Sequence, residues 1–225
     1  MIRFQVFLCL AALSASLRAD SLSDVLARMD KAAPNFHGMK ANVSMLTYTQ
    51  VIDDKAVETG TLEMQRLRHG DVRAVMELSS NGQSRRTLSF SGNTVLMYFA
   101  DSNTYQDYDL KKSGSLINSY LLLGFGSSGT ELSNNYEISY LGEESVDQVK
   151  ASKLQLIPKE KSVLEHLTKV YIWIPVDGAN PVQQQFFEPS GNYRKVTYSD
   201  IQVNPPFAKS GLEFKLPKGA KRVQQ

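Results

Sequence analysis

Few side chains in this sequence have the spacing that catalysis or metal binding requires. The three histidines, His37, His69 and His166, lie far apart and form no H-x-x-x-H or H-E-x-x-H pattern. No G-x-S-x-G nucleophile motif occurs. The carboxylate pairs that a hydrolase could use fall in expected turns or alternate along an exposed strand: Asp53–Asp54, Glu143–Glu144, and Asp107 with Asp109. We therefore expect no enzyme, no metal site and no cofactor.

One short motif resembles a nucleotide-binding sequence. GFGSSG, from Gly124 to Gly129, matches the G-x-G-x-x-G pattern of dinucleotide sites. That chemistry needs a strand before the glycines and a helix after them, so that helix N–H groups meet the pyrophosphate. Here the sequence predicts a helix before the glycines and the turn-rich TELSNNY after them. We interpret the glycines as the end of a helix.

A group of arginines lies on neighbouring expected strands: Arg66, Arg68, Arg73, Arg85 and Arg86. They could form a solvated sheet face with cross-strand acids such as Glu63 and Glu77. Alternatively, one arginine points inward and donates hydrogen bonds to backbone carbonyls of a lid, for which a guanidinium is well suited. Periodicity alone favours the solvated face.

The first 19 residues have the features of a secretory signal peptide. Arg3 precedes an apolar run from Val6 to Leu13, and small residues follow up to Ala19. The run is too short to cross a bilayer as a helix. We expect cleavage after Ala19, which would also remove Cys9, the only cysteine.

A chain that starts at Asp20 has no cysteine, which excludes disulfides, thiolate metal sites and thiol chemistry. Extracellular eukaryotic domains more often carry disulfides, so we expect the bacterial periplasm. Without Arg3 and Arg18 the 25 basic residues become 23, which equals the 23 acidic residues. Such a chain lacks the concentrated basic face that nucleic acids need. We expect no nucleic acid partner, a single domain over residues 20–225, and a monomer.

The mature chain predicts one helix followed mainly by strands. Helical spacing places four apolar side chains on one stripe before Pro34: Leu22, Val25, Leu26 and Met29. After Gly38 the pattern changes to a period of two, and turn residues recur at the interval of an antiparallel meander. We expect about eleven strands, including one at Leu212 to Leu216, and therefore a strongly curled sheet.

Two further segments are more apolar than a solvated surface allows. A central helix is expected within Lys111 to Gly129, and most of its surface is apolar, so it must be buried or cover something apolar. The expected strand from Val95 to Phe99 is apolar on both faces. A half-exposed strand should alternate apolar with polar residues, so the second face of this strand needs a cover.

The order of these parts resembles the LolA family of periplasmic outer-membrane lipoprotein carriers. Asn93 replaces part of the family's D-G turn, and Leu67 stands where a proline usually follows the arginine. The segments that carry the resemblance are VLARMDKA in the first helix, GTLEMQR (Gly60 to Arg66), SGNTVLMYFADSNTYQDYDL, SYLLLG in the central helix, YIWIP (Tyr171 to Pro175), and FKLPKGAKRV (Phe214 to Val223).

The resemblance implies a mainly β fold with lid helices: a half-open antiparallel β-barrel of about eleven strands over a cavity for acyl chains. The implied function is to carry lipoproteins or related lipids from an inner-membrane donor complex to an outer-membrane acceptor. The cavity is then lined by Met64, Leu88, Phe90, Met97, Phe99, Trp173, Phe186 and Phe214. The lid contacts come from Leu26, Met29, Leu116, Tyr120, Leu123 and Phe125. Arg66 would be the lid-locking arginine, although Leu67 leaves this assignment open.

Several alternatives stay open at the level of sequence. Met45, Met64, Met76 and Met97 suit an adaptable cavity, but the same apolar residues could form an ordinary packed core. A slip of one residue along any strand would exchange its two faces. The half-barrel could also belong to a regulatory sensor that resembles RseB and binds a membrane partner, although such sensors generally add a second domain. An enzyme on this scaffold is a further alternative.

Overall fold

The computed structural model describes residues 20–67, 72–82, 84–92, 94–109, 122–208 and 212–223. The predicted signal peptide and the predicted lid residues Leu116 and Tyr120 lie outside these ranges. Within the described ranges, no helix is both long enough and apolar enough to cross a membrane.

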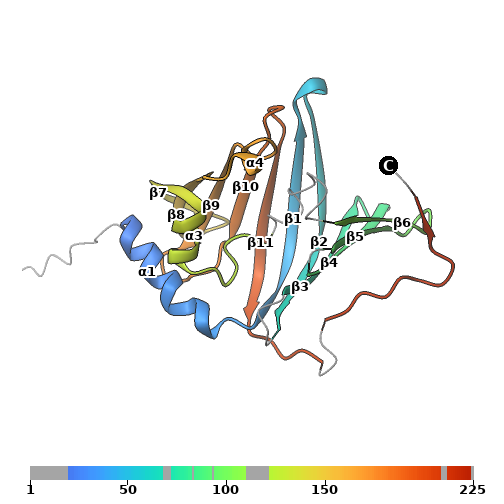
Figure 1. The fold of residues 1–225 in the computed structure, drawn as a ribbon, viewed down its shortest axis with the longest axis horizontal. Helices are drawn as coiled ribbons and strands as arrows, with labels where there is room; N and C mark the ends of the chain where they lie inside the picture. The colour runs from blue at the N-terminus through green and yellow to red at the C-terminus, as the bar shows by residue number, and fades with distance from the viewer. Residues whose placement is uncertain are drawn as a thin grey trace, which may run out of the picture.

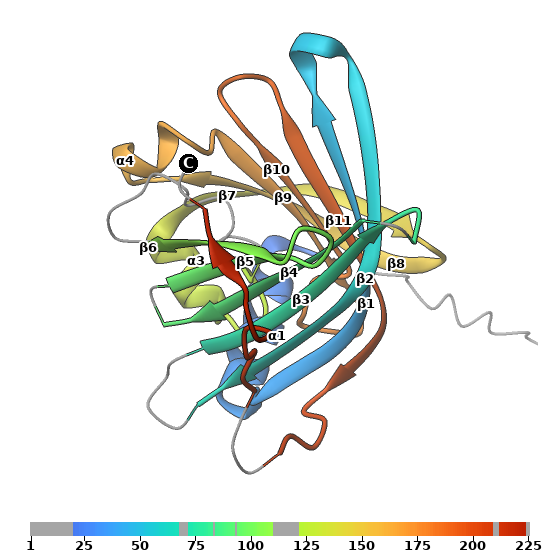
Figure 2. The ribbon, with the colours of Figure 1, turned by 90° about the vertical axis from the view of Figure 1, so that its right-hand side faces the viewer.

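The described strands form one sheet of twelve strands in the order β12-β6-β5-β4-β3-β2-β1-β11-β10-β9-β8-β7. Neighbours pair in antiparallel fashion, except that β12 lies parallel to β6. The sheet curls strongly but stays open, with β7 at one edge and β12 at the other (Figures 1 and 2). The strands are β1 (Gly38–Thr49), β2 (Asp54–Arg66), β3 (Val72–Ser80), β4 (Ser84–Ser91), β5 (Thr94–Phe99), β6 (Thr104–Asp109), β7 (Tyr136–Val146), β8 (Val149–Pro158), β9 (Lys169–Pro175), β10 (Gln183–Phe187), β11 (Tyr193–Val203) and β12 (Lys221–Arg222).

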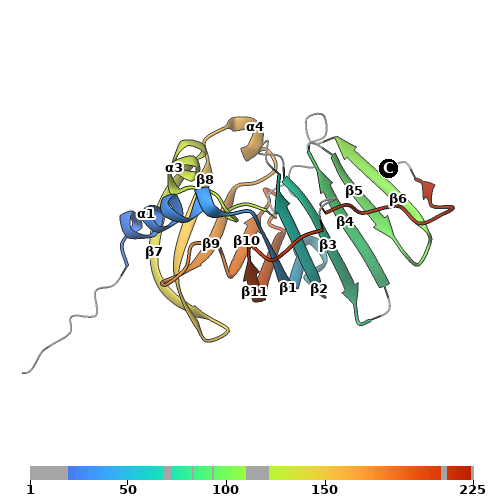
Figure 3. The same cartoon turned by 90° about the horizontal axis from the view of Figure 1, so that it is seen from below.

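Short helices accompany the sheet: α1 (Leu22–Ala32), α3 (Gly129–Asn135) and α4 (Lys161–Leu164), with 3-10 turns η1 (Ala33–Asn35) and η2 (Gln50–Ile52). α1 begins at a capping box in which the Ser21 hydroxyl accepts from the Asp24 N–H and the Asp24 carboxylate accepts from the Ser21 N–H. Its apolar stripe buries Val25 and Met29. α1 and α3 lie together beside β7 to β9 (Figure 3).

Alternation along the strands gives the sheet two faces of different chemistry. We call the face on which α1 and α3 pack the inner face, because Val25, Met29 and Leu132 of these helices join its hydrophobic cluster. Residues that lie opposite each other on neighbouring strands share a face of the sheet. Val43 of β1 lies opposite Gly60 of β2 and Tyr198 of β11, so all three belong to the inner face. The other side is the outer face, and it carries more polar side chains.

The predicted fold class is confirmed, because the chain is mainly β with helices against an open, curled antiparallel sheet. Two local predictions are wrong. TELSNNY does not form a turn but lies mostly in α3, which Ser128 caps at its N-terminus. The run from Leu212 to Leu216 is not a strand, and this part of the chain joins the sheet only at β12.

Candidate functional site: an apolar inner face closed by a loop

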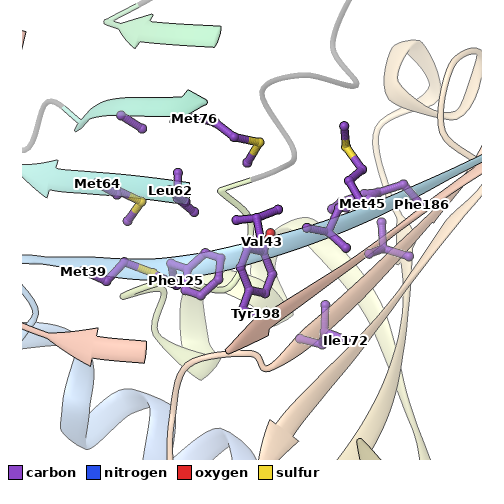
Figure 4. Packing of buried hydrophobic residues seen from close by; sticks show 14 of the residues in the cluster. Met39, Val43, Met45, Leu62, Met64, Met76, Phe125, Ile172, Phe186 and Tyr198 are labelled. Atoms are coloured by element: carbon purple, nitrogen blue, oxygen red, sulfur yellow. The ribbon is translucent and has the colours of Figure 1, made fainter. Parts of the chain in front are cut away.

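Methionines converge on the inner face of the sheet. The sequence has seven methionines, and all except Met1, which lies outside the described ranges, belong to the inner cluster or pack against it. Met39 and Met45 of β1, Met64 of β2 and Met76 of β3 belong to one buried cluster with Phe125 and Tyr198 (Figure 4). Unbranched thioether side chains adapt to partners of variable shape better than branched ones do. The inner face is therefore suited to contact flexible hydrocarbon.

Most residues predicted to line a cavity lie on this face. Met64, Leu88, Phe90 and Phe186 are buried in the inner cluster, and Met97 packs against it. Phe99 is half-buried and shares the strand parity of Met97. The structure therefore brings these six predicted positions to one side of the sheet.

Trp173 and Phe214 differ from that prediction. Trp173 lies on the outer face, opposite in parity to Ile172 and Ile174, and its Nε1–H donates to Glu144 at 2.8 Å. The strand from Val170 to Ile174 is apolar on both faces, so the sequence did not mark which side points inward.

Phe214 is not in a strand, and its ring lies 5.8 Å from the ring of Tyr98. Tyr98 alternates with the inward-facing Met97, so this contact lies on the outer face of β5. The segment from Leu212 to Pro217 thus covers the second face of the strand that is apolar on both sides. Leu96 and Phe214 line one cavity of about 230 Å³ between this segment and the sheet.

The described lid residues meet the cluster from α1 and from residues 122–128, which we call the closing loop. Met29 and Phe125 are buried in the cluster, and Leu123 packs against it. The Phe125 ring meets Tyr198 edge-on at 4.9 Å. Leu26 is half-buried where α1 contacts α3, and a Cβ on Gly129 would come within 2.7 Å of its Cα. This close approach lets the two helices pack as one cover.

Hydrogen bonds to both backbone groups of Gly126 hold the closing loop in place. The Gly126 carbonyl accepts from Arg66 Nη2 at 2.8 Å, and the Gly126 N–H donates to Asn180 Oδ1 at 3.0 Å. Gly126 adopts a positive φ of 62°, and a Cβ there would lie 2.2 Å from the Phe36 ring. The closing loop therefore packs against Phe36 in this conformation only with glycine at position 126.

Arg66 lies at the end of β2 and contacts three parts of the cover. Besides Gly126, its guanidinium approaches the Ala33 carbonyl of η1 at 3.5 Å and lies 5.6 Å from the centroid of the Phe36 ring. Arg66 therefore points inward and donates to backbone carbonyls of the cover, which is one of the two arrangements that the sequence left open. Arg73 instead approaches the Leu212 carbonyl at 3.5 Å, and Arg86 forms an ion pair with Glu58. The lid-locking role of Arg66 stays a prediction.

Gln184 was missed by the sequence analysis. It is fully buried in β10, its Nε2 donates to the Leu123 carbonyl of the closing loop, and its Oε1 accepts from the Tyr198 hydroxyl at 2.6 Å. Burial raises the pKa of the Tyr198 phenol, which therefore stays protonated and can donate. Three consecutive glutamines in an otherwise apolar strand, Gln183 to Gln185, were the signal that could have indicated a buried amide.

A polar network anchors the start of α1 to the sheet. Asp20 accepts two bonds from Arg28, at 2.8 and 2.7 Å, and one from the Ser152 hydroxyl at 2.7 Å. Arg28 also donates to the carbonyls of Pro175 and Gly178, both at 3.2 Å. The bonded guanidinium lowers the pKa of the Asp20 carboxyl despite the opposing effect of burial.

A cavity of about 190 Å³ lies under the end of α1, with Met29, Phe36 and Gly126 among its lining residues. Pockets for small molecules are typically about 300–1,000 Å³. Entry of a long hydrocarbon at this place therefore requires the closing loop to move.

The described residues offer little for other chemistries. Among them, no group of His, Cys, Asp and Glu side chains could hold a metal ion. At the start of α3, the Ser128 hydroxyl accepts from the Glu131 N–H and Asp30 accepts from the Thr130 N–H at 2.9 Å. Two of the backbone donors that a nucleotide phosphate would use after GFGSSG, the Thr130 and Glu131 N–H groups, are thus bonded within the protein.

No protein-family model matches the sequence, and no curated protein matches it. Solved structures do match. MucB is 14% identical over 88% of this chain with a TM-score of 0.52, and the match spans 63% of the length of MucB. An uncharacterized conserved protein from Thermus thermophilus is 12% identical over 92% of this chain and 100% of its own, with a TM-score of 0.51.

The LolA superfamily protein NE2245 from Nitrosomonas europaea is 13% identical over 87% of this chain and 99% of its own, with a TM-score of 0.41. The chain shares its fold, an open curled sheet with helices on its inner face, with MucB and with the Thermus thermophilus protein. At 14% and 12% identity these two likenesses show the fold alone.

Proposed function

We propose that this protein is a periplasmic, non-enzymatic carrier that shields the acyl chains of lipoproteins or related lipids on its inner face. It would receive them from an inner-membrane donor complex and deliver them to an outer-membrane acceptor. The observation that carries the proposal is the inner face itself. Methionines and rings converge there beneath a cover that is partly a loop, and hydrogen bonds rather than a second sheet hold that loop in place.

The energetics favour a shielded site with a cover that can open. Burying hydrocarbon gains about 0.8 kcal/mol per CH2, so one chain of sixteen carbons is worth on the order of 10 kcal/mol gross. Such a chain does not cross an aqueous compartment bare. A site that retained all of this free energy would not release its cargo, so opening the closing loop should consume part of it. The bonds from Arg66, Asn180 and Gln184 to this loop are suited to set that cost.

The direct test combines mass spectrometry of the purified protein with displacement of a fluorescent fatty acid. We expect co-purified lipid and displacement at micromolar concentration. Absence of both would reject the proposal.

Two neighbouring residues of β5 provide a matched pair of variants. Met97 and Leu96 are both half-buried, and alternation places Met97 on the inner face and Leu96 on the outer face. Met97→Glu should abolish displacement because it buries a charge against hydrocarbon. Leu96→Glu should retain displacement. Equal effects of the two changes, in variants with native circular dichroism, would contradict an inner-face site.

A regulatory sensor is the second candidate function, and the likeness of fold to MucB is the observation that favours it. Because this chain spans 63% of the length of MucB, it leaves more than a third of that protein unmatched. A pull-down separates the two functions. Capture of acylated lipoproteins favours the carrier, whereas capture of a transmembrane anti-sigma factor without lipoproteins favours the sensor.

A further inference from the structure

On several strands the inner face changes from apolar to charged toward the same end of the sheet. Along β2 the inward positions run from Met64 and Leu62 through Gly60 to Glu58. Along β4 they run from Phe90 and Leu88 to Arg86, and along β11 from Tyr198 and Val196 to Arg194. The inner face is therefore amphiphilic along the strands, with hydrocarbon toward the cover and charge toward the opposite end.

The register places the three charged residues around one site. Glu58 lies opposite Met45, and Arg194 lies opposite Thr47, the next inward position on β1. Arg86 reaches Glu58 with both Nε, at 2.7 Å, and Nη2. The side chains of Arg86 and Glu58 are 26% and 18% exposed. The site is thus partly shielded from water and adjoins the methionines.

Electrostatics indicate that these groups influence one another. Burial is the main cause that lowers the pKa of Arg194, Arg86 adds to it, and Glu188 and Glu58 oppose it. Glu188 lies beyond the end of β10, where its backbone N–H donates to Asn192. Guanidinium groups stay charged at physiological pH even when the pKa falls. Two cations of the inner face, Arg86 and Arg194, therefore lie within the influence of the same carboxylate, Glu58.

A partly buried ion pair on an apolar face is not an efficient way to stabilise a fold, because desolvation offsets much of the attraction. Two arginines beside hydrocarbon are, in contrast, well suited to an amphiphile with a negative head. Guanidiniums bind carboxylate and phosphate oxygens in a bidentate manner.

We propose that Arg86 and Arg194, with Glu58 between them, form a headgroup subsite for an anionic amphiphile whose hydrocarbon lies against the inner-face methionines. This inference rests on the proposed function, since it assigns the head of a ligand whose tail the carrier shields. The chemistry that the subsite recognises is a carboxylate or a phosphate on a long alkyl chain. Glu58 competes with that head for Arg86.

The test measures the affinities of three probes of equal chain length by displacement of a fluorescent fatty acid: hexadecanoate, hexadecyl phosphate and hexadecanol. The wild type should bind the anions about tenfold or more tightly than the alcohol, as expected for one charged hydrogen-bonded contact. A preference for only one of the two anions identifies the carboxylate or the phosphate as the natural head.

Variants test which residues cause the preference for the anionic probes over hexadecanol. Arg194→Gln and Arg86→Gln should each reduce it several-fold and leave hexadecanol affinity unchanged, whereas Glu58→Gln should increase it. Arg85, next in sequence but exposed and of opposite parity, provides the matched control, and Arg85→Gln should leave the preference intact.

Two results would overturn the subsite. One is equal binding of all three probes by the wild type, and the other is an anion preference that survives in both Arg86→Gln and Arg194→Gln. Failure of the proposed function gives a different result, because then hexadecanol also fails to bind. A folded Glu58→Gln variant keeps the test valid if an arginine variant is unstable.

Discussion

Replacing Arg66 with methionine should release the closing loop while the sheet stays folded. The substitution keeps an apolar stem but removes the 2.8 Å bond to the Gly126 carbonyl and the contact with the Phe36 ring. A hydrogen bond from a charged donor contributes about 1.5–3 kcal/mol. A cation–π contact contributes about 0.5–1 kcal/mol at a partly exposed site. Because Arg66 is half-buried, we expect about 2–3 kcal/mol less resistance to local opening.

Amide hydrogen exchange measures this opening directly. A loss of about 2–3 kcal/mol accelerates exchange roughly 30- to 150-fold when opening is local and reversible. The Gly126 N–H, which is bonded to Asn180, and the Phe125 N–H, which is bonded to Leu122, should show this increase. Amides in the ladder between β1 and β2 should not change.

Arg73→Met is the matched control. Arg73 is on the neighbouring strand, and its guanidinium approaches the Leu212 carbonyl rather than the closing loop. Unchanged exchange at the Gly126 N–H in Arg66→Met would refute the role of Arg66 in holding the closing loop. Equal acceleration in both variants would refute it too, because it would indicate a general loss of stability.

Three further predictions address other parts of the structure. Gly126→Ala should lower the free energy of unfolding in urea by about 2–4 kcal/mol, from a strained positive φ and overlap with the Phe36 ring. Gly92→Ala, with a similar φ but no atom within 4 Å of the new Cβ, should cost only the backbone strain, and equal losses would contradict the packing argument. The pKa of Asp20 is lowered in the fold, so its anchoring of α1 is complete above the unfolded pKa of about 3.9 and is lost as pH falls through the lower folded pKa. Asp20→Asn should therefore reduce stability at neutral pH but make little difference in strong acid, as acid titration of urea midpoints will show. Trp173, the only tryptophan, lies on the outer face, so lipid binding should leave its emission maximum unchanged, and a large shift would indicate an outer-face site.

The fold could be predicted from sequence because it depends on local patterns. The apolar stripe of α1 and its end before Pro34, and the alternation of the strands, are all visible in the chain. The position of Leu212 to Leu216 could not be predicted this way. This segment has the apolar pattern of a strand but pairs with none, and it lies over the outer face instead.

The candidate site was predictable where one face of a strand is clearly apolar and the other is polar. Leu88 and Phe90 alternate with Thr87 and Ser89, so their inward direction was evident. Trp173 lies in a strand without such contrast, and its direction depends on the pairing of β8 to β10. Gln184 acquires its role only through the distant loop that it holds, which no local pattern encodes.

The most direct test of the central claim is to locate bound hydrocarbon by methionine methyl NMR. Stearic acid that carries a nitroxide along its chain broadens the signals of nearby methyl groups. Added to protein with labelled methionine methyl groups, it should broaden Met45, Met64, Met76 and Met97, and reduction of the nitroxide should restore these signals. Unbroadened inner-face methionines in folded protein at saturating spin label would contradict the proposal that this face shields acyl chains.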